Sequence, residues 1–437
     1  MKMEEYLNLL AEQIRCRQAR GAVCEEIRDH IEEQKEAFQR EGMGPEEAEC
    51  AAVKEMGDPV EAGTALDRIH RPKMAWGMMC MIGILSIVGL GMQYFVGLHL
   101  EDGSSFRLEK QLTFLILGLL LMILVCFADY SRIGLHAREL TILTFAGLMV
   151  GRNLFGAQIN GITDWICFFG TSLDIRMAAM VFVPLYGAIL YLYRGQGYIA
   201  LLKAGFWMLP GLFTVWSCRS ILYLMIMFVS FHTLLILAVS KNWFHINRKR
   251  TLAGMGTWLI LLPLATGGLL YQSGGYKIER IKLILHPEVY SEQVKIVKEI
   301  LKESRWLGTG DVFLPDWHMD LSDYLLTCII SYFGIVAAVI VTGLVAFLFF
   351  HFLRISLCQK NQMGMIMGAG CCEVWMMNLI CYVANNLGAM PMRVYCPFLT
   401  RGGSGTLILY MMLGLLLSIY RYQNVLPEIK INRPQAE

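Results

Sequence analysis

The segment from 314 to 327, LPDWHMDLSDYLLT, gathers the side chains best suited to chemistry. Asp316, His318, Asp320 and Asp323 fall within eight positions, and the apolar run that follows begins at Asp323. A polar residue here could simply cap the next helix, and acids in a loop are usually solvated, which is the interpretation preferred for Asp316 and Asp320. An ionised carboxylate placed deep in a membrane costs up to about 3 kcal/mol. Asp323 is therefore the candidate functional acid.

The elements that would position these residues are membrane-spanning helices. The chain has 437 residues, of which 56% are hydrophobic and 17% charged, with a mean hydropathy of +0.49. This balance indicates an all-α, polytopic membrane protein. About ten apolar runs follow Met74, each long enough to cross a hydrocarbon core of about 30 Å. They lie near residues 74–98, 110–128, 134–151, 176–193, 200–217, 220–240, 251–271, 323–351, 365–389 and 404–421.

The basic residues between these runs predict the orientation. With the amino terminus in the cytoplasm, the positive-inside pattern is satisfied throughout. An even number of spans returns the carboxyl tail to the cytoplasm, and the longest connection, about 272–322, then lies outside. Ser291 can cap an amphipathic helix in that connection, either on the membrane surface or packed on the rest of the loop. The cytoplasmic loops would hold Arg132 and Arg138, Arg194 and Lys203, Lys241, Arg248, Lys249 and Arg250, Arg354 and Lys360, and Arg421.

Residues 1–72 form a separate acidic unit ahead of the membrane domain, 73–437. The amino terminus, MKMEEYLNLLAEQIR, is amphipathic and does not read as a signal peptide. Gly44-Pro45 and Asp58-Pro59 are typical helix starts. The dense acids between them most often form a solvated face, and a partner-binding surface is the alternative. The stretch VCEEIRDHIEEQKEAF and its continuation resemble the helical prefix domain found ahead of some bacterial permeases and membrane regulators.

Several features of the sequence indicate no further binding site or partner. The formal net charge of +2 hides an acidic amino-terminal segment and basic loops, so it says nothing about nucleic-acid binding, and no nucleic-acid partner is expected. The 13 cysteines include no CxxC pair, so reduced packing thiols are expected. His232 is typical of a polar group in helix packing rather than of a metal ligand. No ligand set requires a metal or cofactor, although a divalent cation could assist a charged substrate.

The segment around Asp323 resembles a motif of a known family. FLPDWHMDLSDYLLTCIISYFG is similar to LPExxTDFIFxxxxEExG, the outer loop and following helix of the FtsW/RodA/SpoVE proteins, also called shape, elongation, division and sporulation (SEDS) proteins. Asp323 matches the aspartate of that pattern if about three residues are inserted after LPD. Without the insertion, Asp320 takes the place.

A second segment, residues 385–421, is similar to the family motif GLLPxTGxxLPFxSYGGSSL. Gly402, Gly403 and Ser404 fall where that motif has its own Gly-Gly-Ser, which could leave free amides near a cavity or simply allow tight helix packing. The segment NGITDWI is similar to NGAxRWI and keeps Trp165. The chain departs from the family where it reads SLDIRMAAM for QPSE followed by lysine, VWSCRSILY for QPDLGTA, and Arg401 for the tyrosine of SYGGSS.

The resemblance implies a peptidoglycan glycosyltransferase of the bacterial cytoplasmic membrane, acting in division, elongation or sporulation. Such an enzyme polymerises lipid II at the outer face and works with a class B penicillin-binding protein. Asp323, or alternatively Asp320, would be the general base, and Arg393 and Arg401 would neutralise the leaving pyrophosphate, with Arg176 a poorer choice. The remaining substrate-binding candidates are Trp165, His318, Gly402, Gly403 and Ser404.

Two other functions fit parts of the sequence. The departures from the family motifs favour a non-catalytic scaffold or regulator of a cell-wall synthase. The many spans and the large outer loop would suit a lipid or solute transporter, although the spans carry few of the ionisable residues that transporters bury near the midplane.

Overall fold

The computed structural model describes residues 1–100, 108–159, 161–168, 170–272, 282–283, 286–310, 321–423 and 425. The chain divides into two compact units. One comprises Met1–Ala75 with Gln359–Gln362 and Leu417–Glu437, and the other comprises Trp76–Cys358 with Met363–Leu416.

The first unit contains four helices. Proline occupies the first turn of both the third and the fourth helix, and the Asp58 carboxylate caps the fourth by accepting a hydrogen bond from the Val60 amide at 2.9 Å. Tyr6, Leu10 and Ile31 are fully buried at the centre of this unit. The acids of the second helix are mostly exposed to solvent. The helices are α1 (Met3–Gln13), α2 (Arg17–Arg40), α3 (Pro45–Glu55) and α4 (Pro59–His70).

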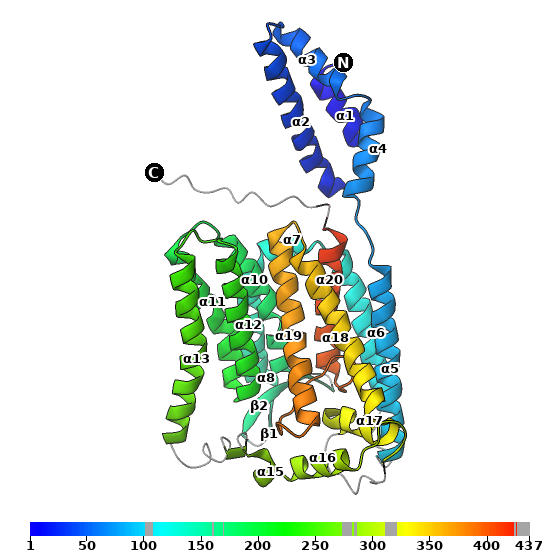
Figure 1. Ribbon diagram of the computed structural model, residues 1–437, viewed down its shortest axis with the longest axis vertical. Coiled ribbons are helices and arrows are strands. Elements are labelled where there is room, and N and C mark those ends of the chain that lie inside the picture. Colours follow the sequence, from blue (N-terminus) through cyan, green and yellow to red (C-terminus); the bar gives the residue numbers. More distant parts are fainter. Residues whose placement is uncertain are drawn as a thin grey trace. The chain divides into compact units, whose positions relative to one another are not determined.

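The second unit is a bundle of long helices that run side by side (Figure 1). Within the described residues, eight segments are long and apolar enough to cross a membrane. The predicted polytopic helical membrane protein is therefore confirmed. The long helices are α5 (Trp76–Leu100), α6 (Leu108–Phe127), α8 (Ala137–Phe155), α10 (Phe182–Leu192), α11 (Tyr198–Ser217), α12 (Ile221–Ser240), α13 (Arg248–Gln272), α18 (Ile335–Leu357), α19 (Gln362–Asn386) and α20 (Gly403–Arg421). Two short helices, α7 (Tyr130–Leu135) and α9 (Ile175–Ala179), precede α8 and α10.

The predicted single span over 323–351 is wrong, because the chain breaks at Gly334. A 3-10 turn, η1 (Leu321–Tyr324), leads into the short helix α17 (Leu325–Phe333), and α18 starts only after Gly334. Gly334 has a φ of 89°, which a helix cannot accommodate. Figure 1 shows α17 set across the end of α18 instead of continuing it. Asp323 consequently lies in η1 and not in a membrane-spanning helix.

A three-stranded antiparallel sheet, which the sequence did not predict, lies beside the helices. Its strands are β1 (Gly156–Ile159), β2 (Ile162–Phe168) and β3 (Thr171–Asp174), in the order β1-β2-β3. The register pairs Trp165 of β2 with Asp174 of β3. The sheet therefore brings together two residues from segments that look unrelated in the sequence.

The connection after α13 contains α15 (Pro287–Tyr290) and α16 (Glu292–Lys302). As predicted, Ser291 caps α16: its hydroxyl accepts a hydrogen bond from the Val294 amide at 3.4 Å. The apolar stripe of α16, including Val297 and Ile300, is buried, and the helix packs against α17. The sequence predicted packing on the membrane surface or on the rest of the loop, whereas the observed partner, α17, lies beyond that loop.

Replacing Gly334 by Ala is expected to destabilise the protein. The φ of 89° is strained for any residue with a Cβ, and that Cβ would lie 2.6 Å from the carbonyl oxygen of Trp306. The expected loss is about 1–3 kcal/mol of the free energy of unfolding, measured by thermal denaturation in detergent. Gly343→Ala in α18 is the control, because a Cβ there meets no atom within 4 Å. Equal melting temperatures for the two variants would contradict the strained break at Gly334.

Candidate active site

Asp323 is held in a largely buried position beside Arg393. Its side chain is 13% exposed, and its Oδ2 lies 3.5 Å from Nε of Arg393, whose side chain is 76% exposed. Burial, followed by the charge of Asp323, raises the pKa of Tyr324 to about 12.

The end of α19 fixes the backbone of Asp323. The side-chain amides of Asn385 and Asn386 donate hydrogen bonds to the Asp323 carbonyl oxygen at 3.3 Å and 3.0 Å. Oδ1 of Asn386 accepts from the Thr327 amide at 3.0 Å, and Oδ1 of Asn385 accepts from the Met392 amide at 3.0 Å. Both asparagines are almost fully buried. This network ties η1 to the loop that carries Arg393, so the acid and the arginine are positioned together.

A buried cluster of charges forms around Arg176, at the start of α9. Its guanidinium donates to Asp174 from Nε at 3.0 Å and from Nη2 at 2.8 Å, and its Nη1 lies 3.4 Å from Asp164. The three side chains are 16%, 9% and 17% exposed in that order. Burial raises the pKa of the Asp164 carboxyl, while Arg176 opposes the shift. Two carboxylates thus already face Arg176, which explains physically why it suits a pyrophosphate poorly.

Aromatic residues lie against the guanidinium of Arg176. The guanidinium carbon of Arg176 lies 6.0 Å from the ring centre of the half-buried Trp165 and 5.7 Å from that of Tyr223. Tyr223, on α12, is within electrostatic reach of Asp174, Arg176 and Asp323. Its hydroxyl accepts a hydrogen bond from the Tyr395 amide at 3.2 Å. Tyr223 therefore contacts the charged cluster and also binds the loop that follows α19.

The turn formed by Gly402, Gly403 and Ser404 is held by direct contacts. The Gly402 amide donates to Oε1 of Gln111 at 3.3 Å, and the Ser404 hydroxyl accepts from the Asp174 amide at 3.1 Å. A Cβ on Gly403 would lie 2.5 Å from the ring of Phe114, which accounts for glycine at this position. These contacts favour the packing role over the free-amide role for the Gly402 amide.

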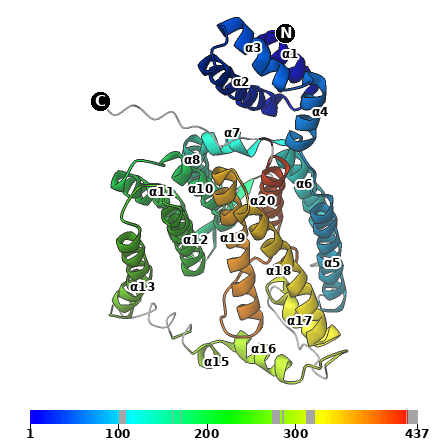
Figure 2. The ribbon, with the colours of Figure 1, turned by 45° about the horizontal axis from the view of Figure 1, so that its top comes forward.

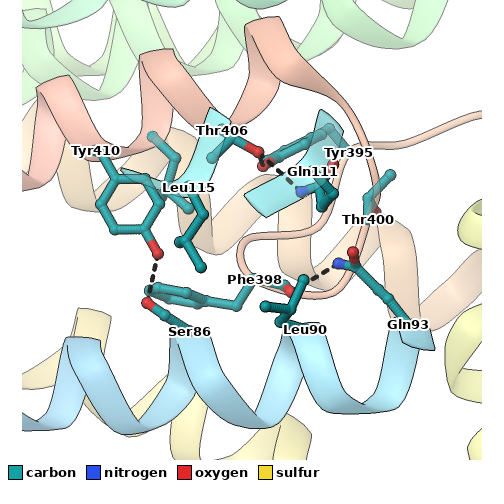
Figure 3. Close-up of a pocket in the computed structure, with 11 residues that line it drawn as sticks. Ser86, Leu90, Gln93, Gln111, Leu115, Tyr395, Phe398, Thr400, Thr406 and Tyr410 are labelled. Atoms are coloured by element: carbon teal, nitrogen blue, oxygen red, sulfur yellow. Dashed lines mark hydrogen bonds between the residues drawn. The ribbon is translucent and has the colours of Figure 1, made fainter. Parts of the chain in front are cut away.

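The preceding loop is anchored on α5 and α6, as Figure 3 shows. Nε2 of Gln93 donates to the carbonyl oxygens of Phe398 and Leu399 at 3.2 Å and 2.9 Å. Phe398 has a φ of 66°, a strained conformation for a residue with a Cβ. The cavity between these groups has a volume of about 20 Å³, which is room for one water molecule. The loop that carries Arg401 is therefore a firmly held element.

The structure brings some of the predicted residues together and leaves others apart. Asp323 contacts Arg393, Trp165 contacts Arg176, and Ser404 contacts Asp174. Arg401 is half-buried beside the glycine turn. His318 and Asp320 lie outside the described residues. Within the described part of the chain, no group of three or more His, Cys, Asp or Glu side chains could hold a metal ion.

Asp164, Asp174, Tyr223, Asn385 and Asn386 were not predicted as site residues. One sequence signal could have revealed Asp174. In SLDIRMAAM an acidic residue precedes a basic one, as in the family segment in which QPSE is followed by lysine. No local signal marks Tyr223, because a tyrosine in the apolar first turns of α12 looks like any packing residue. Asn385 and Asn386 stand at the end of an apolar helix, and an ordinary helix terminus explains them equally well from the sequence.

Comparisons with known proteins identify the family of this chain. A sequence model for the FtsW/RodA/SpoVE family, described as cell cycle protein, matches residues 71–425. The probable peptidoglycan glycosyltransferase FtsW of Trichlorobacter lovleyi is 24% identical over 375 residues, covering 78% of this chain and 92% of the relative. The peptidoglycan glycosyltransferase RodA of Treponema pallidum is 23% identical over 423 residues, covering 78% of this chain and 96% of the relative.

Solved structures share the fold. A chain from a peptidoglycan synthase complex, described as coordinating polymerization and crosslinking, superposes with a TM-score of 0.65 at 20% identity, covering 80% of this chain and 99% of that one. The rod shape determining protein RodA of Thermus thermophilus gives a TM-score of 0.56 at 17% identity, covering 80% of this chain and 97% of that one. Since the family model covers most of the chain, including the sheet, η1 and the glycine turn, this protein belongs to the FtsW/RodA/SpoVE family of cell cycle proteins.

Proposed function

We propose that this chain is a peptidoglycan glycosyltransferase that polymerises lipid II at the outer face of the bacterial cytoplasmic membrane. Its relatives named above carry that activity in their names. The observation that carries the proposal is the placement of Asp323: its side chain is 13% exposed and lies next to an exposed arginine, and two buried asparagines hold its backbone carbonyl oxygen. A general base needs this combination of fixed geometry and access to substrate.

The reaction joins two lipid-linked sugars. A sugar hydroxyl attacks the anomeric carbon of the second lipid, a new C–O bond forms, and the bond to the pyrophosphate breaks with its electron pair going to the leaving group. Asp323 accepts the hydroxyl proton, a role worth about 10²- to 10⁴-fold in rate. Arg393 is exposed enough to turn from Asp323 toward the developing pyrophosphate charge, and Arg401 is the second candidate cation.

The Arg176 cluster has a positioning role in this proposal. Arg176 and Asp174 fix the start of α9, the Asp174 amide holds Ser404, and Arg176 lies against Trp165. The half-buried indole of Trp165 would offer an apolar face to a sugar ring. Because Asp164 and Asp174 already neutralise Arg176, its contribution is to hold the sheet and the turn in place.

The chain is a multi-pass membrane protein, and we place both termini in the cytoplasm. The basic loops support this orientation, since they alternate with the spans as the positive-inside pattern requires. A class B penicillin-binding protein is the proposed partner. The structurally similar peptidoglycan synthase complex, which couples polymerization to crosslinking, supports that pairing.

The test is polymerisation of labelled lipid II by the purified full chain, with and without a cognate class B penicillin-binding protein. Glycan strands are expected, and more of them with the partner present. Co-purification with the partner but no product under any condition would favour the scaffold function, which the replacement of the family's motif tyrosine by Arg401 supports. Movement of labelled lipid across proteoliposomes without polymer would instead favour a transporter.

A further inference from the structure

A lateral groove lies between α11 and α13, with α12 as its floor. Its volume is about 730 Å³, within the range of about 300–1,000 Å³ that ligand sites occupy. One face of α11, from Tyr198 to Leu212, forms a wall, and Phe228, His232 and Leu235 of α12 line the floor. In Figures 1 and 2, α13 lies at the edge of its unit beside α12. The groove is therefore open to the surrounding lipid.

The groove has the dimensions of one lipid chain. Its α11 wall spans fourteen residue steps between Tyr198 and Leu212, which is about 21 Å of helix and more than half of a hydrocarbon core of about 30 Å. Gly205 and Gly254 face it from the two walls, and a Cβ on either would meet no atom within 4 Å. These two glycines keep the middle of the groove wide.

One end of the groove carries an unusual charge. Arg248, Lys249 and Arg250 form the first turn of α13, which contains no acidic residue, and Arg250 itself lines the groove. Among the residues that the structure describes, no carboxylate forms an ion pair with any of the three. Cations at a helix amino terminus oppose the helix dipole, whereas an anion bound there would interact favourably with both the cations and the dipole.

This end lies away from the candidate active site. Tyr223 is near the start of α12, whereas the groove residues of this helix, Phe228, His232 and Leu235, lie farther along it toward Ser240. In the orientation proposed from the basic loops, the charged end faces the cytoplasm. Lipids of the cytoplasmic leaflet are partly anionic and are attracted to such basic segments.

We propose that this groove binds one anionic phospholipid of the cytoplasmic leaflet. An acyl chain lies along α11 and α13, and the phosphate lies at Arg250. The lipid supports α13, whose packing within the protein is mainly against α12. This site is additional to the glycosyltransferase function and rests on the proposed orientation of the termini.

The test uses native mass spectrometry of the purified full chain in detergent, incubated with dioleoyl phosphatidylglycerol or dioleoyl phosphatidylcholine. We expect one phosphatidylglycerol to be retained about fivefold more strongly than phosphatidylcholine, the factor that corresponds to about 1 kcal/mol from one cation. Arg250→Gln should remove that preference. Gly254→Phe and Gly205→Phe should remove binding of both lipids, because the new ring fills the groove.

Gly343→Phe in α18 is the matched control, since a Cβ there also meets open space, and it should bind lipid as the wild type does. Equal retention of the two lipids by the wild type would overturn the proposal, as would unchanged binding in both groove-filling variants. Displacement of phosphatidylglycerol by undecaprenyl phosphate at equal concentration would assign the groove to the polyprenyl substrate and would likewise overturn it. All these outcomes are read without an activity assay, so they are independent of the polymerase proposal.

Discussion

Replacing Asp323 by Asn is expected to lower lipid II polymerisation about 10²- to 10⁴-fold while the protein still folds. The amide cannot accept the hydroxyl proton, but it keeps the shape of the side chain. The backbone carbonyl of residue 323 still accepts hydrogen bonds from Asn385 and Asn386, as it does now. The ion pair with Arg393 is lost, and that costs little because the arginine is 76% exposed. Polymer length and rate on labelled lipid II, together with the melting temperature, are the measurements.

The matched control is Glu288→Gln. Glu288 is a solvent-exposed acid of α15, 3.7 Å from Lys298, and its removal should leave polymerisation unchanged. Asp320→Asn separates the two motif alignments, because it should be nearly silent if Asp323 is the base. Normal activity of Asp323→Asn together with an inactive Asp320→Asn would transfer the role to Asp320.

Replacing Arg176 by Met should cause the largest loss of stability. The substitution would remove the cation that Asp164 and Asp174, 17% and 9% exposed, share as their ion-pair partner. Breaking a buried ion pair from one side typically costs about 3–5 kcal/mol, because a charge stays buried without compensation. A lower melting temperature and a reduced yield of folded protein in detergent are expected. Polymerisation should fall along with the folded fraction.

Arg393→Met provides the comparison, since the same change at an exposed arginine should cost at most about 1 kcal/mol. Combining Arg176→Met with Asp164→Asn and Asp174→Asn should restore much of the stability, as no buried charge then remains. Asn also preserves the cap that Asp174 now provides to the Arg176 amide. If the single and the triple variant melt at the same temperature, uncompensated buried charge is not the cause of the stability lost in Arg176→Met.

Local patterns in the sequence determined the class of protein and much of its helical layout. Hydropathy marks a membrane helix without reference to any distant residue, because each span hydrogen-bonds internally and needs only apolar side chains outside. Proline at a first turn and a capping aspartate act within four residues, so the starts of α3 and α4 followed directly. The motif around Asp323 identified the family for the same reason, since its residues are nearly contiguous.

The break between α17 and α18 shows what local sequence patterns do not predict. The run from Leu325 onward is apolar on both sides of Gly334, and hydropathy carries no information on φ. Only glycine fits at position 334, because φ is positive there and the backbone of Trp306 and Leu307, almost thirty positions away, leaves no room for a Cβ. Only the tertiary contact therefore removes Asp323 from the membrane-spanning helix.

The charged cluster also depends on contacts between distant segments. Asp164, Asp174 and Arg176 are separated in the sequence by a strand turn, and the register of the sheet brings them together. Tyr223 of α12 contacts Arg176 of this cluster, and Asn385 and Asn386 of α19 bind the backbone of Asp323. By itself, the sequence determined the candidate acid, Asp323, and the class of protein, a polytopic helical membrane protein. The tertiary structure decided what holds that acid, because burial and ion pairing are properties of neighbours in space.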